Sequence, residues 1–197
     1  MQYVKNEIRQ RIIDAAREEF LAKGFEKASV RIITTKAKTS KSNLYNYFKD
    51  KDSLFYSVLE PTLFKIEKGL ESAKAYNVPK KLDTYTKESQ KFVIDLVTEF
   101  VSENLIEVKL LLFQSRGSSL ETIKCKVVDA FSDLLYDWIK SINPDKEVSK
   151  FFLRCIANFY LSILEQMLIY LTTREEVEKA GTEFLEFVYH GWKGVLK

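Results

Sequence analysis

Residues 25–51, FEKASVRIITTKAKTSKSNLYNYFKDK, contain two short segments in which apolar residues recur at helical spacing. A hydroxyl residue that can cap a helix start stands before each segment. The first helix is predicted at roughly residues 29–36, with Ser29 as its cap, and the second at roughly 40–47. Two short helices joined by a tight turn form a helix-turn-helix arrangement.

The second of these helices has an apolar and a polar side. Leu44, Tyr45 and Phe48 recur at helical spacing and can be buried, and Thr39 or Ser40 can accept a free backbone N–H at the helix start. The polar side carries residues that suit base edges and phosphates in a major groove, namely Lys41, Ser42, Asn43, Asn46 and Tyr47. A helix pair with such residues is often only a solvated surface, so this pattern alone leaves DNA binding open.

A third helix is predicted to begin near Lys51, with Asp50 as its cap. The start of a helix offers free N–H groups and the positive end of a dipole to a nearby phosphate. Lys51 is therefore placed to clamp a DNA backbone. The same helix is predicted to run to about residue 75, and Pro61 is expected either to kink it or to split it.

Charge is distributed unevenly along the chain, which carries a formal net charge of +3. Residues 1–51 hold 12 Lys and Arg against 6 Asp and Glu, whereas residues 52–197 hold 19 against 22. A basic block of this kind attracts phosphates, and the mildly acidic remainder disfavours nucleic acid over the rest of the surface. The charge pattern therefore favours DNA binding by the first quarter of the chain.

The first 51 residues closely resemble the N-terminal domain of the TetR family of transcriptional regulators. In that family an opening helix carries an I-x-D-A-A-x-x-x-F-x-x-x-G-F/Y pattern, followed by an S-K-x-x-L-Y-x-Y/H-F-x-x-K signature. The residues that match are Ile12, Asp14, Ala15, Ala16, Phe20, Gly24, Phe25, Ser40, Lys41, Leu44, Tyr45, Tyr47, Phe48 and Lys51. Gly24 is expected to end the opening helix in the left-handed conformation.

The resemblance implies which residues touch DNA. Positions where the family contacts DNA, chiefly phosphates, are occupied here by Ser29, Ser40, Lys41, Ser42, Tyr45, Tyr47 and Lys51. Asn43 and Asn46 lie on the reading helix, and Asn43 is the candidate for base discrimination. For Tyr45 an alternative is open, in which its ring is part of the core and only its hydroxyl points out.

Two positions depart from the family pattern. The family usually has an Ala-Gly-Val turn between the two helices, and here Ala37, Lys38 and Thr39 occupy it. A residue other than glycine at positive φ costs on the order of 1 kcal/mol, and Lys38 adds a charge near the DNA side. Ser42 replaces another common glycine. These changes bear on the operator sequence rather than on DNA binding itself.

The chain after residue 51 is helical in pattern, so an all-α fold is expected. The predicted division is a helix-turn-helix domain at residues 1–50 and a larger helical domain for ligand binding and dimerisation at 51–197. Further helices are predicted at roughly 84–103, at 120–142, over the apolar stretch 151–171 and at 174–195, with a short helix before a loop at 115–119.

The stretch from Phe151 to Leu171 is long and apolar enough to suggest a membrane span. Arg154, Asn158 and Glu165 interrupt it, and unpaired charges are costly in hydrocarbon, so a helix buried between a core and a second subunit is favoured. The last two helices are expected to form a homodimer, which would read an inverted repeat on double-stranded DNA.

The resemblance implies a pocket for a small-molecule effector among the middle helices. Aromatic residues of this domain suggest an apolar or aromatic ligand, although aromatic residues at helical spacing are more often plain core. The candidates are Phe92, Phe100, Phe113, Phe131, Trp138 and Phe159. Arg154 and Glu165 are alternatives for a charged ligand, or for an internal ion pair.

Other sequence features favour a cytoplasmic regulator without catalysis. The sequence holds no nucleophile–base pattern, no phosphate-binding glycine loop and no HExxH site, so neither an enzyme nor a cofactor is expected. Cys125 and Cys155 are expected to be buried apolar residues, and His190 to be a surface or interface residue. The first residues lack the apolar run of a signal peptide.

Overall fold

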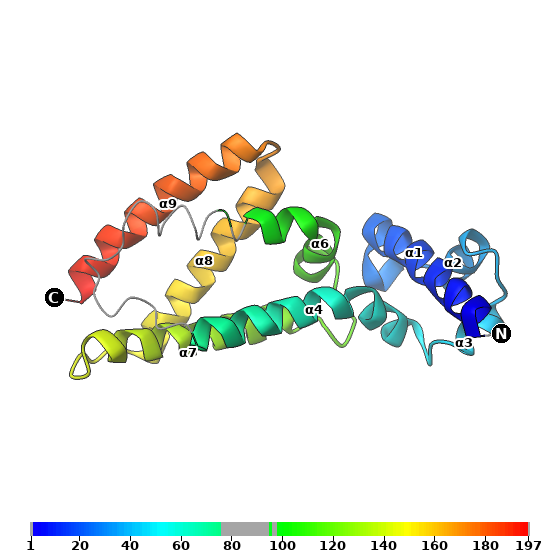
Figure 1. Ribbon diagram of the computed structural model, residues 1–197, viewed down its shortest axis with the longest axis horizontal. Helices are drawn as coiled ribbons and strands as arrows, with labels where there is room; N and C mark the ends of the chain where they lie inside the picture. The colour runs from blue at the N-terminus through cyan, green and yellow to red at the C-terminus, as the bar shows by residue number, and fades with distance from the viewer. Residues whose placement is uncertain (1, 76–94, 96–97, 197) are drawn as a thin grey trace. The chain divides into compact units, whose positions relative to one another are not determined.

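The computed structural model describes residues 2–75, 95 and 98–196 of the 197-residue chain. These residues form helices and turns and contain no strand, which confirms the predicted all-α fold (Figure 1). The helices are α1 Gln2–Lys27, α2 Val30–Lys36, α3 Lys41–Tyr45, α4 Lys51–Ala75, α6 Leu105–Phe113, α7 Ile123–Ile142, α8 Lys150–Tyr170 and α9 Arg174–Val195. Residues 98–103 are also helical, whereas most of the helix predicted at 84–103 lies outside the described residues.

The described residues form two compact units. Those up to Glu67 and from Asn104 to Lys124 make the first unit, and the others make the second. Helix α4 supplies residues to both units, because it continues without a break past Glu67. Pro61 lies on its exposed side and does not split it.

The core of the first unit is built around three phenylalanine rings. The rings of Phe20 and Phe55 meet edge to face with centroids 4.9 Å apart, and Phe25 lies 6.0 Å from Phe20 and 5.1 Å from Phe55. The small side chains of Ala15 and Ala16 are buried in the same cluster, as are Leu110 and Leu111 of α6. Helix α6 is thus part of the core that supports α1 to α3.

Gly24 lies where α1 bends. Its φ of 71° is positive as expected, but its ψ of 166° is not that of a left-handed helical residue. Gly24 still interrupts the helix, and a second helical segment follows it to Lys27. This combination of φ and ψ is open almost only to glycine. The bend allows the backbone N–H of Phe25 to donate to the carbonyl of Gln114, at 2.8 Å.

Side-chain caps fix four of the helix starts in the described residues, those of α3, α4, α8 and α9. The hydroxyl of Ser40 accepts the N–H of Asn43 at the start of α3. The carboxylate of Asp50 accepts the N–H of Ser53, and this bond lowers the pKa of Asp50. Ser29 stands before α2 as predicted, but no capping bond of its side chain occurs among the described residues.

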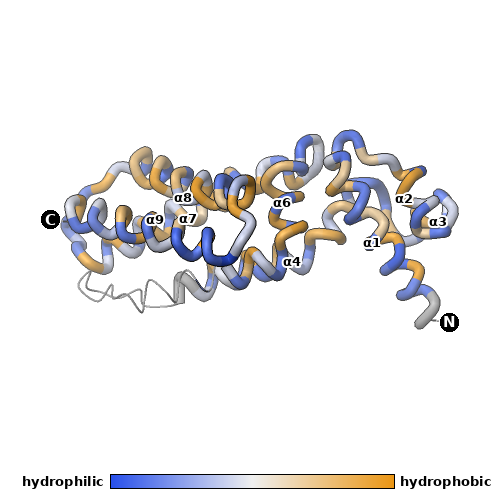
Figure 2. The backbone as a smooth tube through the Cα atoms, turned by 90° about the horizontal axis from the view of Figure 1, so that it is seen from above, coloured by the Kyte–Doolittle hydropathy of each residue, from blue (hydrophilic) through white to orange (hydrophobic). Residues whose placement is uncertain are grey.

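The second unit leaves much of its apolar surface exposed. Helix α8 buries Leu153, Ala157 and Leu168, while Phe151 is 77% exposed and Tyr170 is 71% exposed. Its tube is coloured hydrophobic over much of its length in Figure 2. Among the described residues, the length and composition of α8 alone would allow it to cross a membrane.

The expected burial of the two cysteines is wrong. Cys125 on α7 and Cys155 on α8 are both exposed free thiols. The helical spacing that suggested a buried position gives each helix an apolar face, and the cysteines lie off those faces. His190 is exposed on α9, with its ring 5.4 Å from that of Tyr189.

Candidate nucleic-acid interface and apolar cavity

Helix α3 is held on the first unit by its apolar side. Leu44 is fully buried and Phe48, just after the helix, is 3% exposed, and both belong to the core that α1, α2 and α6 share. The opposite side of α3 is open, with exposed side chains of Lys41, Ser42 and Asn46. The fold therefore presents to solvent three of the residues predicted to contact DNA.

The two tyrosines of α3 and its C-terminal turn differ in burial. Tyr45 is 41% exposed, and the ammonium of Lys41 lies 5.9 Å from its ring centroid. Tyr47 instead packs against the core of the first unit. Tyr47, and not Tyr45, thus has the core position that was considered for Tyr45. Tyr45 follows the buried Leu44 by one residue, which turns it about 100° away from the core, whereas three residues bring Tyr47 back toward the same side.

Asn43 is half-buried at the edge of the exposed side of α3. Its backbone N–H donates to the Ser40 hydroxyl at 3.0 Å, and its side-chain Nδ2 donates to the Thr39 hydroxyl at 2.8 Å. The amide of Asn43 is therefore held at one orientation by the residue that ends the turn.

The turn between α2 and α3 contains the strained residue that the sequence predicts. Lys38 has a φ of 50°, and among the described residues it is the one non-glycine residue with a positive φ. Its side chain is exposed beside Thr39 and Ser40.

Lys51 has a structural role in addition to the predicted phosphate contact. Its ammonium donates to the carbonyls of Phe25 at 2.8 Å, Glu26 at 3.2 Å and Ala28 at 3.4 Å, and it lies 4.6 Å from the centroid of the Phe25 ring. An ammonium has three protons, and each has an acceptor here. Lys51 thus ties the C-terminal end of α1 to the start of α4.

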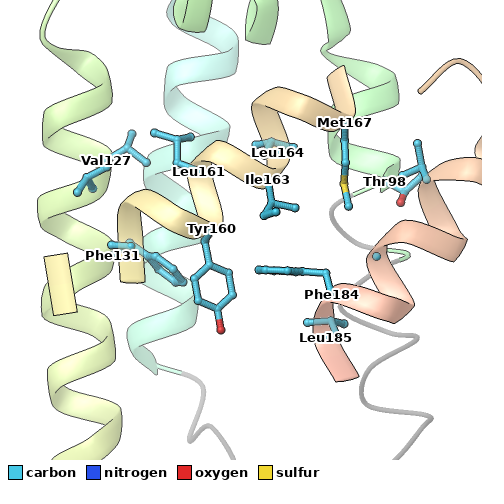
Figure 3. Close-up of a pocket in the computed structure, with 14 residues that line it drawn as sticks. Thr98, Val127, Phe131, Tyr160, Leu161, Ile163, Leu164, Met167, Phe184 and Leu185 are labelled. Carbon is cyan, nitrogen blue, oxygen red and sulfur yellow. The ribbon is translucent and has the colours of Figure 1, made fainter. Parts of the chain in front are cut away.

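The second unit contains an apolar cavity of about 380 Å³ (Figure 3). Its walls come from α7, α8 and α9, together with Thr98. They are formed by Thr98, Val127, Val128, Phe131, Ala157, Tyr160, Leu161, Ile163, Leu164, Met167, Val177, Gly181, Phe184 and Leu185.

The cavity wall offers few polar groups. The Tyr160 hydroxyl accepts a hydrogen bond from Trp192 Nε1 at 3.2 Å, and its ring meets Phe131 edge to face with centroids 5.2 Å apart. The other wall residue with a hydroxyl is Thr98. The lining thus suits an apolar molecule, because a charge placed there would be desolvated without a charged partner among the wall residues.

One of the six aromatic residues predicted to bind a ligand, Phe131, lies on the cavity wall. Phe92 lies outside the described residues, and Phe100 is half-buried without lining the cavity. Trp138 packs edge to face on Trp192, with centroids 5.1 Å apart. Phe113 belongs to the first unit, and Phe159 is 39% exposed on α8.

Most wall residues that sequence reasoning missed are aliphatic. Ala157, Leu161, Leu164 and Met167 follow one another on α8 at steps of three or four, which is the spacing of one helix face. That spacing was visible in the sequence, but nothing in it separates a cavity wall from a packed core. Arg154 forms an exposed ion pair with Asp129 and lines no part of the cavity.

A comparison with protein-family models identifies the N-terminal part of the first unit. Residues 12–58 match the family model described as bacterial regulatory proteins of the tetR family. This stretch is a TetR-type N-terminal domain. A search of curated proteins finds no match to the chain.

Solved structures of TetR-type regulators share the fold over nearly the whole chain. A TetR-family transcriptional regulator from Syntrophomonas wolfei is 23% identical, with a TM-score of 0.66, and the match covers 93% of this chain and 95% of that one. A regulator from Aquifex aeolicus is 22% identical, with a TM-score of 0.64, and the coverages are 92% and 99%. FadR from Bacillus subtilis, solved with stearoyl-CoA, is 16% identical, with a TM-score of 0.60 and coverages of 92% and 98%.

Proposed function

We propose that this TetR-family chain is a ligand-responsive transcriptional regulator, a repressor that binds an inverted-repeat operator as a homodimer and is released by a small apolar ligand. The observation that carries the proposal is the construction of α3. Its buried side, Leu44 and the adjoining Phe48, anchors it to a closed core, and its open side presents Lys41, Ser42 and Asn46. Such residues suit phosphates and base edges.

The charge of the first quarter of the chain supports this role. An excess of six basic residues over acidic ones in residues 1–51 attracts the phosphate backbone. A purely structural helical adaptor would explain the apolar helices of the second unit but not this basic block. A regulator of this kind acts on DNA in the cytoplasm.

The exposed apolar side chains of α8 and α9 support a homodimer. Phe151 and Tyr170 of α8 and Phe187 of α9 are each more than 60% exposed, and burying large apolar side chains against a second copy is favourable. A twofold dimer places two α3 helices on one side of a DNA duplex, so each half of an inverted repeat is read by one copy.

The cavity of the second unit supports an apolar ligand. FadR, which shares the fold, was solved with stearoyl-CoA, and an acyl chain suits a wall made almost wholly of hydrocarbon. Binding would favour one conformation of α4, the helix that continues from the first unit into the second, and would thereby change the separation of the two reading helices.

The experiment that tests DNA binding is fluorescence anisotropy of labelled DNA from the flanks of the chain's own gene, with scrambled competitor at two salt concentrations. Binding that resists the competitor is expected. Binding that is equal for both DNAs and collapses with salt would reduce the first unit to a basic surface.

Ligand response is tested on the protein–DNA complex with stearoyl-CoA, and with coenzyme A alone as the control. Release of DNA by stearoyl-CoA but not by coenzyme A is expected. Leu161→Trp, which fills the cavity, should weaken the release and leave DNA binding unchanged, because Leu161 lies on the wall and outside the first unit. Release by both compounds, or by neither, would contradict an apolar acyl ligand.

A further inference from the structure

We propose that Thr39 is a positioning residue for sequence recognition, and that the Asn43 side chain that it holds reads an adenine in each half of the operator. The inference rests on the proposed DNA-binding function and adds to it a named base and a residue with no expected DNA contact. Its starting point is the 2.8 Å hydrogen bond from Asn43 Nδ2 to the Thr39 hydroxyl.

Two hydrogen bonds fix Asn43 at both ends. Its backbone N–H is bound to Ser40 Oγ at 3.0 Å, and its side-chain amide is bound to Thr39. Both partners precede Asn43 in the chain and lie at the start of α3, where Lys38 makes the turn at a φ of 50°. The side-chain amide therefore has little rotational freedom left to lose when DNA binds, and lower ordering entropy favours binding.

The hydrogen bond to Thr39 also decides which groups of Asn43 are available. An amide has two N–H donors and a carbonyl acceptor, and one donor is used by Thr39. Among the described residues, the second N–H and the carbonyl Oδ1 have no protein partner. A donor and an acceptor side by side match the edge of adenine, which offers N7 as acceptor and its N6 amino group as donor.

The other bases fit this pair of groups less well. Guanine offers two acceptors in the major groove, cytosine offers a donor, and thymine offers an acceptor beside a methyl group. A bidentate contact of this kind is worth a discrimination of roughly 5-fold to 150-fold against the wrong base. Adenine is therefore the base that the held amide selects.

Thr39 occupies the position where the TetR pattern usually has valine. Valine has the same shape as threonine but lacks the hydroxyl, so Thr39→Val removes the acceptor of the hydrogen bond and keeps the packing. Thr39→Ser restores a hydroxyl. These two variants separate the hydrogen bond from the shape of the side chain.

The test is selection from a library of duplex DNA with a randomised centre, followed by sequencing of the bound fraction. The wild-type chain is expected to enrich an inverted repeat with an adenine at one position of each half, and Asn43→Ala should lose that preference. Thr39→Val should lower the same preference at least about fivefold, while Thr39→Ser should keep it. A variant that combines Thr39→Val with Asn43→Ala should have the same base preference as Asn43→Ala alone, because both changes act through one contact.

A merely structural role of Thr39 would lower the melting temperature and weaken binding to all sequences, so thermal unfolding of each variant accompanies the selection. Undiminished adenine preference in Thr39→Val, or a base other than adenine at the position that Asn43→Ala relaxes, would overturn the inference while leaving the DNA-binding function in place. A wild-type chain that enriches no sequence would instead overturn the proposed function, and the inference with it.

Discussion

The two units of this chain differ in how completely their cores are closed. Of the ten largest fully buried side chains, eight lie in the first unit and two, Ile139 and Leu153, in the second. The second unit instead contains an apolar cavity and exposed rings such as those of Phe151 and Phe187. The proposed function explains this difference: a helix that reads DNA needs a rigid support, whereas a domain that accepts a ligand and a second copy must leave apolar surface unfilled.

The largest expected effect is on the closed core. Phe20→Ala should lower the free energy of unfolding of the first unit by about 3–5 kcal/mol, because the buried ring contacts Phe25 and Phe55 and its removal leaves a cavity. Phe184→Ala, on the wall of the existing cavity, should cost less. Denaturant unfolding followed by circular dichroism measures both, and equal losses would remove the contrast between the units.

A second comparison uses a glycine from each unit. Gly24→Ala should destabilise by about 1–3 kcal/mol, because its φ and ψ exclude other residues and a Cβ would lie 2.5 Å from Gln114 Oε1. Gly191→Ala, in α9, should stabilise by about 0.5–1 kcal/mol, because an added Cβ would meet no atom within 4 Å there. Melting temperatures of the two variants should shift in opposite directions.

Within the first unit, substitutions of Lys51 and Lys41 compare a lysine that supports the fold with a lysine on the surface. Lys51→Ala should cost about 1–2 kcal/mol of stability, because its ammonium bonds three carbonyls. Lys41→Ala should leave stability unchanged, weaken binding to all DNA sequences and lower the salt slope by about 1. Anisotropy titrations over a salt series, beside thermal melts, check both. A stable Lys51→Ala variant with a lowered salt slope would return Lys51 to the role of a phosphate clamp.

The smallest expected effect concerns the turn. Lys38→Gly should stabilise by about 0.5–1 kcal/mol, because relief of the strain at a φ of 50° slightly exceeds the extra freedom of glycine in the unfolded chain. The same variant removes a positive charge, so DNA affinity should fall slightly at low salt. Chemical denaturation and a low-salt titration separate the two, and a loss of stability would show that Lys38 makes contacts that offset its strain.

The sequence predicted the helices of both units well, because periodic apolar residues and caps act locally. Ser40 and Asp50 cap the helices that they were expected to cap. Ser29 makes no such side-chain cap, and its backbone N–H donates instead to the buried carboxylate of Glu19, at 3.2 Å. That bond joins residues ten apart in the sequence, and no local pattern announces it.

The site of the second unit was harder to predict for a physical reason. Aromatic residues at helical spacing occur in a core, on a surface and on a cavity wall alike. Here Trp138 packs in the core, Phe159 is exposed on the surface and Phe131 lines the cavity. Which of these positions a ring has depends on the helix it meets. Hydropathy along the chain contains no such information.

The packing of α6 on α1 determines which fragments of this protein can fold and can be fused to other domains. Gln114 accepts the N–H of Phe25, Glu107 pairs with Arg17 at 2.5 Å, and Leu110 fills the same core as Phe20. A fragment that stops soon after the family signature would leave that core uncovered on one side and prone to aggregate. An engineer who grafts this DNA-binding head onto a different sensor domain would therefore need to transplant two separate stretches of sequence, with residues 104–124 accompanying the N-terminal one.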